Sequence, residues 1–125
     1  MGVKKLSVKD EISKAISAHG QWKQKLRTAI QTGECESTPS KVKQDNNCAF
    51  GKWLHERIDG GAKGSVYYSD VVDLHAEFHQ QAGAILELAV NGDPEQARGL
   101  MGLGQPFAKY SSALTLKLKE WQAAL

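Results

Sequence analysis

The side chains of this sequence that could do chemistry together are three histidines and one cysteine. His75 and His79 lie four residues apart in a segment of helical periodicity, so they share one helix face. With His19 and Cys48, they offer three imidazole nitrogens and one thiolate sulfur. That donor set suits a four-coordinate, tetrahedral Zn²⁺ site, although donor type alone leaves copper and nickel open. The pattern therefore predicts a metal site, with zinc as the best fit.

The ordinary interpretation of a histidine on an apolar helix face is a core residue whose ring nitrogens are hydrogen-bonded. Here His19, His75 and His79 all fall on inward-facing positions, and Cys48 lies on a short segment between them. This combination favours a metal site over three separate core histidines. His55 does not follow the pattern, and we interpret it as a surface residue.

The sequence lacks the further groups that catalysis at these residues would need. A Cys–His nucleophile needs an orienting third group and an oxyanion hole, and the sequence marks neither. A di-iron site needs several inward carboxylates, but Asp73 and Glu77 lie off the stripe that carries the histidines. Four protein ligands would also close the metal site against hydrolysis. We therefore expect no enzyme.

Helices are the elements that must position these four residues. The spacing of apolar residues predicts helices over about 8–31, over about 66–90, and from Pro94 onward, the last with a kink or break within 102–106. A short helix should carry Cys48. Long amphipathic helices with short connections imply an all-α fold. We expect an antiparallel four-helix bundle with an additional short helix that carries the cysteine.

Punctuating residues mark where these helices begin and end. Gly33 and the pair Asn91-Gly92 are stop signals, and Asp93 before a proline is typical of a helix start. Asn47 is a candidate N-cap for the short helix, and residues 34–47 are predicted to form a long loop.

Length and composition restrict the class of protein further. The 125 residues suffice for one domain, which we expect to span 1–125. Lysines are interspersed with acidic residues rather than clustered with aromatics, so nucleic acid is not an expected partner. No apolar run reaches the roughly 18 residues of a membrane span, and the N-terminus has no apolar signal region, so a cytoplasmic protein without a membrane partner is expected. Cys35, in a polar segment, is interpreted as incidental.

A resemblance to a known family rests on three motifs. Residues 48–54, CAFGKWL, resemble the Cys-x-Phe-Gly-Lys-Trp-Leu signature of the CZB family, the chemoreceptor zinc-binding domain. His19 followed three residues later by Trp22 resembles the family's upstream motif, and residues 75–79, HAEFH, resemble its His-x-x-x-His motif. Order and spacing agree over about 12–121, with no departure at the four donors.

The resemblance implies a bundle that holds one Zn²⁺ through His19, Cys48, His75 and His79. It also implies a bacterial cytoplasmic sensory domain of the kind found at the ends of chemoreceptors and beside diguanylate cyclase domains, acting as a homodimer. Members are linked to sensing of zinc and, in some cases, of hypochlorous acid. A structural zinc in a bundle that serves dimerisation or protein binding is the alternative, because sensing and structure need the same four ligands.

Overall fold

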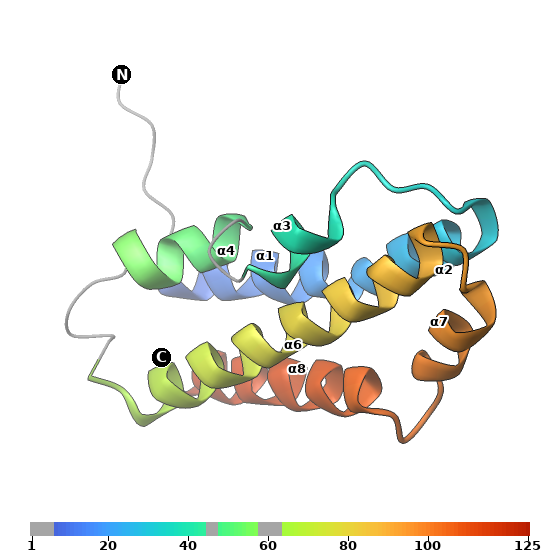
Figure 1. Cartoon of the computed structure of the whole chain (residues 1–125). Coiled ribbons are helices and arrows are strands. Elements are labelled where there is room, and N and C mark those ends of the chain that lie inside the picture. The colour runs from blue at the N-terminus through green and yellow to red at the C-terminus, as the bar shows by residue number, and fades with distance from the viewer. Residues whose placement is uncertain (1–6, 45–47, 58–63) are drawn as a thin grey trace.

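The computed structural model describes residues 7–44, 48–57 and 64–125 (Figure 1). Every regular element within these residues is helical, which confirms the predicted all-α bundle. The elements are α1 (Val8–Gly20), α2 (Trp22–Thr32), α3 (Pro39–Lys43), α4 (Ala49–Lys52), the π-helical turn η1 (Trp53–Arg57), α6 (Val66–Val90), α7 (Pro94–Leu100) and α8 (Pro106–Ala124). None of these described helices is both long enough and apolar enough to cross a membrane.

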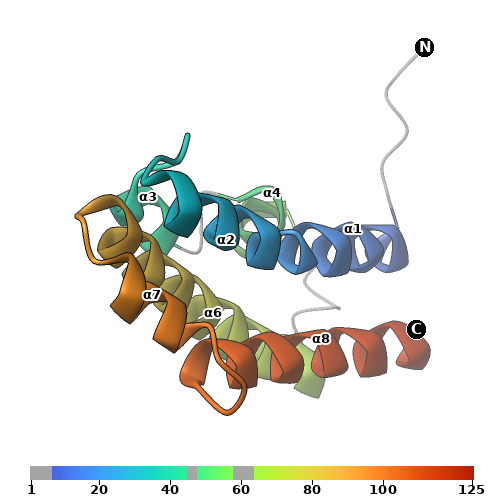
Figure 2. The same ribbon diagram turned by 90° about the vertical axis from the view of Figure 1, so that its right-hand side faces the viewer.

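The long helix α6 is the centre of the arrangement, with α2, α3, α7 and α8 packed against it (Figures 1 and 2). Two aromatic pairs show how α6 runs relative to α8. The ring of Tyr68 lies 6.4 Å from that of Trp121, and the ring of Phe78 lies 5.4 Å from that of Phe107. Residue numbers rise along one helix while they fall along the other, so α6 and α8 are antiparallel.

The short elements α3, α4 and η1 together form an arm that also runs antiparallel to α6. Lys43 contacts Glu87, Cys48 contacts His75, and the carbonyl of Leu54 accepts a hydrogen bond from Tyr68. Partners on α6 thus fall in number as the arm proceeds. The arm brings Cys48 to the middle of α6, where the two histidines lie.

The helix ends follow local rules that the sequence displays. Ser7 and Asp10 form a reciprocal capping box at the start of α1. Gly33 and Gly92 adopt φ of 74° and 90°, a left-handed conformation that glycine adopts without steric cost. Asp93 caps α7 through the backbone N–H of Gln96. The predicted stops at Gly33 and Gly92 and the predicted start at Asp93 are confirmed.

Three local features differ from the sequence-based expectation. The predicted helix over 8–31 is divided at Gln21 into α1 and α2, although Gln21 keeps right-handed helical φ and ψ of −68° and −19° and its N–H still bonds to the carbonyl of Ser17. The predicted loop over 34–47 contains α3, which begins with Thr38 as N-cap. Asn47, the predicted cap of the short helix, lies outside the described residues, and Cys48 holds the N-cap position of α4.

The last predicted helix is broken, as its glycines and proline indicated. It consists of α7 and α8, with residues 101–105 in a turn between them and Gly104 at φ 83°. Pro106 then begins α8, where its missing N–H costs nothing. The buried face of α8 supplies Phe107, Leu114, Leu118 and Trp121 to the core.

Candidate metal centre

Four side chains from three helices converge beside the middle of α6. His19 comes from the last turn of α1, Cys48 from the N-cap of α4, and His75 and His79 from successive turns of α6. One nitrogen or sulfur atom from each lies within 4.8 Å of all the others. The histidines are buried, with 4%, 0% and 2% of their surface exposed, and Cys48 is half-buried. The structure therefore brings together all four residues singled out in the sequence.

Backbone carbonyls orient two of the imidazoles. Nδ1 of His19 lies 2.7 Å from the carbonyl oxygen of Ala15, one turn earlier in α1. Nδ1 of His79 lies 2.9 Å from the carbonyl oxygen of Val42 in α3. Because a carbonyl can only accept, each Nδ1 carries the proton and each Nε2 keeps its lone pair. This is the outer-shell arrangement typical of metal-binding histidines.

The third imidazole supplies the distances that test a metal. Nε2 of His75 lies 3.1 Å from Nε2 of His79 and 3.3 Å from Sγ of Cys48. Usual zinc bond lengths in a tetrahedron separate two nitrogens by roughly 3.3 Å and a nitrogen from a sulfur by roughly 3.6 Å. These two edges already have nearly the required length, so the donor set fits Zn²⁺. Nδ1 of His75 is buried and has no hydrogen-bond partner among the described residues.

Cys48 is placed by the start of α4. Its sulfur accepts a hydrogen bond from the backbone N–H of Gly51, at 3.2 Å. A donor of this kind stabilises a thiolate, which is the form that binds metals. The aromatic residues of the signature are core: Phe50 is buried and stacks on Trp53, with ring centroids 5.6 Å apart. They serve the site by fixing where the sulfur lies.

Apolar rings surround the imidazoles and keep them neutral. Phe78 packs edge-on against His19 at 5.1 Å, and Phe50 packs edge-on against His75 at 5.3 Å. Burial lowers the pKa of His19 from 6.5 to about 4. The hydrogen bond to the Ala15 carbonyl raises this pKa in part, and His79 lowers it by a smaller amount. Burial, followed by the neighbouring imidazoles, lowers the pKa of His75 to about 2. Neutral imidazole is the form that a metal requires.

The remaining candidates lie outside this group. His55 is exposed, as predicted, and so are Asp73 and Glu77, whose positions off the stripe argued against a di-iron site. Cys35 is half-buried and is not among the converging donors. What sequence reasoning missed is the carbonyl of Val42, because a backbone acceptor has no residue-type signature.

Comparison with known proteins agrees with this chemistry. The family model of the chemoreceptor zinc-binding domain matches residues 19–86, more than half of the 125-residue chain, and that range contains all four donors. Neither the curated proteins nor the solved structures that were compared gave a match.

Proposed function

The chain belongs to the chemoreceptor zinc-binding domain family, and from this premise we propose that it is a cytoplasmic sensory domain that binds one zinc ion through His19, Cys48, His75 and His79. The observation that carries the proposal is the convergence of these four buried or half-buried donors within 4.8 Å. A bound zinc would supply a tetrahedral junction between α1, α4 and α6. With four protein ligands no position is left open for a substrate, so we propose no enzymatic activity.

Metal occupancy is the first candidate for the signal. Three donors belong to α1 and α6, which pack within the bundle, whereas Cys48 caps a helix of four residues. A helix that short has little stability of its own. The position of α4 therefore depends on the Cys48 donor and on the packing of Phe50. Loss of the metal would loosen α4 against α1 and α6.

Oxidation of Cys48 is the second candidate, and a specific feature favours it. A cavity of about 110 Å³ adjoins Cys48 and His19, lined also by Lys14, Ala18 and Trp22. Hypochlorous acid is small enough to enter such a space. The thiolate would take up the OH group and lose two electrons, giving sulfenic acid, while the chlorine leaves as chloride. Sulfenic acid is a weaker metal donor than thiolate, so oxidation would release the ion.

Assembly and output extend the proposal by family resemblance alone. We propose that residues 1–125 act as a single domain, that the domain forms a homodimer, and that it reports to a chemoreceptor signalling domain or a diguanylate cyclase. The alternative function is a structural zinc that holds a bundle used for dimerisation or protein binding. It needs the same four residues, so it differs only in whether the metal exchanges.

Native mass spectrometry of the purified chain tests these proposals. We expect one zinc per chain in the parent and a weakened complex in Cys48→Ser. A chelator that removes zinc while circular dichroism shows the helices intact would support a sensor, whereas unfolding would support a structural zinc. Stoichiometric hypochlorous acid should release zinc from the parent and less readily from Cys48→Ser. A parent that binds no zinc would refute the assignment.

A further inference from the structure

The histidine stripe of α6 continues beyond the metal centre. Steps of four residues lead from His75 through His79 to Gly83 and Glu87, and residues at this spacing share one helix face. The first two residues are donors at the centre, and the next two contact α3. One face of α6 thus carries both the centre and the docking site of α3.

The contacts between α3 and α6 are close and specific. A Cβ atom on Gly83 would overlap Cγ of Lys43 and would lie 3.1 Å both from the backbone nitrogen of Lys43 and from the carbonyl oxygen of Pro39. Only glycine allows α3 to approach this closely. The amide of Gln80 donates to the carbonyl of Lys43 at 3.2 Å, and the Lys43 ammonium pairs with Glu87 at 2.8 Å. These contacts hold the end of α3.

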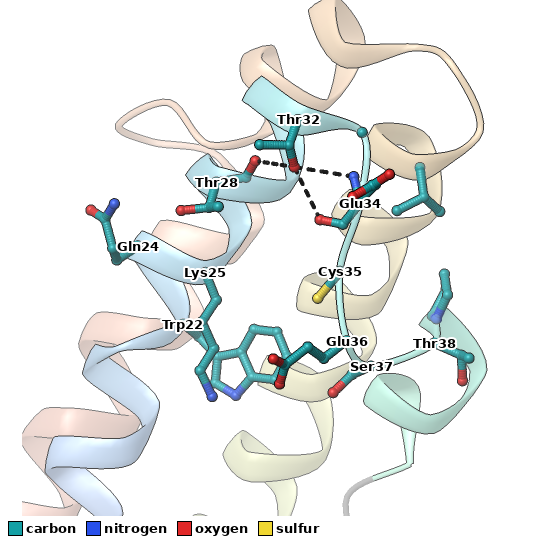
Figure 3. Close-up of a pocket in the computed structure, with 13 residues that line it drawn as sticks. Trp22, Gln24, Lys25, Thr28, Thr32, Glu34, Cys35, Glu36, Ser37 and Thr38 are labelled. Atoms are coloured by element: carbon teal, nitrogen blue, oxygen red, sulfur yellow. Dashed lines mark hydrogen bonds between the residues drawn. The ribbon is translucent and has the colours of Figure 1, made fainter.

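The chain leading into α3 stands apart from α2. Figure 3 shows α2, which carries Trp22 and Lys25, on one side of this space and the segment with Cys35 and Ser37 on the other. A groove of about 860 Å³ lies between the two walls. α3 packs chiefly against α6, so this contact helps to fix the position of α3 and, with it, the carbonyl of Val42.

We propose that α3 is a positioning element for the metal centre, docked through Gly83, Gln80 and Glu87 so that the carbonyl of Val42 orients His79. This inference rests on the proposed zinc binding. His19 is oriented by a carbonyl of its own helix, one turn away. His79 takes its acceptor from a segment 37 residues earlier in the chain. Displacing α3 should therefore affect His79 and leave His19 unchanged.

Gly83→Ala in the full-length chain is the test, because the added methyl group displaces the Lys43 side chain and crowds two backbone atoms of α3 at 3.1 Å. Gly99→Ala is the matched control, since a Cβ at that helical glycine meets nothing within 4 Å. Zinc affinity is measured by competition with a chromophoric chelator. Loss of an outer-shell partner lowers metal affinity by about 10- to 100-fold. We expect a fall of about tenfold or more in Gly83→Ala and none in Gly99→Ala.

Nitrogen-15 NMR of the imidazoles separates positioning from general damage. In Gly83→Ala the Nδ1–H signal of His79 should shift or broaden through faster exchange, while that of His19 stays unchanged. If Gly83→Ala does not fold, the double variant Gln80→Ala/Glu87→Gln, which alters only exposed side chains, decides by the same two measurements.

The outcomes separate this inference from the function on which it rests. A parent that binds no zinc refutes the proposed function. A parent that binds zinc, beside a folded Gly83→Ala of equal affinity and unchanged His79 signal, overturns only the role of α3. Equal shifts at His19 and His79 would also overturn it, because they would mean general loosening.

Discussion

At the scale of the residue, the buried imidazoles link metal binding to protonation. His19 and His75 pack among aromatic rings that exclude water, so a positive charge on either is strongly disfavoured. The same burial that lowers their pKa values keeps both imidazoles neutral, which is the form that binds a metal. Metal binding and acid sensitivity therefore have one physical origin at these two residues.

The metal-free protein should lose stability as the pH falls below about 6.5. In that range the unfolded histidines take up protons, while folded His19, with a pKa of about 4, and folded His75, with a pKa of about 2, do not. Above the pKa of the unfolded histidines, neither histidine lowers the stability of the folded protein. Below that pKa, each histidine lowers the free energy of unfolding by about 1.4 kcal/mol per pH unit, until the pH reaches the pKa of that histidine in the folded protein. Urea denaturation at pH 7.5, 6 and 5 measures this slope.

His75→Leu isolates the contribution of one histidine to that slope. Leucine cannot be protonated and leaves no buried ring nitrogen without a partner, so the metal-free variant should be more stable than the parent at pH 5 and should bind zinc poorly. An unchanged slope in His75→Leu would show that other groups cause the acid sensitivity.

At the scale of the element, α4 and η1 are anchored at two points, by the metal centre at the beginning of α4 and by aromatic packing at the beginning of η1. Cys48 lies at the beginning of α4, and Trp53 begins η1. Trp53 is 6% exposed, stacks on Phe50 and lies 6.2 Å from the ring of Trp121 on α8. Its contacts anchor η1 independently of the donors, while α4 depends also on Cys48.

Trp53→Ala should therefore destabilise the chain without removing a zinc donor. Truncating a buried tryptophan costs about 3–5 kcal/mol, measurable by urea denaturation. Trp22→Ala is the matched control, because Trp22 is half-buried and stacks beside the Lys25 ammonium at 4.9 Å. We expect a smaller loss there. Equal losses, or a Trp53→Ala variant that no longer binds one zinc per chain, would contradict independent anchoring.

The elements differ in how far the sequence could predict them, and the reason is physical. The ends of α6 and α7 depend on nearby caps and glycines, so local rules found them. The five-residue α3 has little stability without its contacts to α6, and those contacts are not visible in the sequence of 34–47. The group of three histidines and one cysteine could be predicted because the signal lies in residue types and spacing. The four-residue step pairs His75 with His79, and the motifs mark Cys48 and His19. The Val42 carbonyl depends on tertiary docking, which residue type does not encode.

At the scale of the whole molecule, the metal centre connects three helices of the bundle, whereas one end of the bundle contributes no residue to it. α1, α4 and α6 contribute donors, and α3 contacts His79. α7 instead packs against α2 and α6 at the end of the bundle beyond α3 (Figure 1). Zinc should therefore order part of the molecule more than the rest.

Hydrogen exchange followed by mass spectrometry should map this asymmetry. Adding zinc to the metal-free chain should slow exchange most in α4, in α3 and in the last turn of α1, and least in α7. The gain reflects the free energy of binding, which is available only to segments whose opening breaks the centre. Uniform slowing over all helices would instead indicate that zinc acts through global stability alone.

Cys48 has a further consequence, because a single atom serves two purposes. Its sulfur is a candidate metal donor and also accepts the N–H of Gly51 that begins α4. On the proposed function, the atom that meets the stimulus is the atom on which the helix starts. Detection and the first mechanical response would then be one event, with no relay of side chains between them.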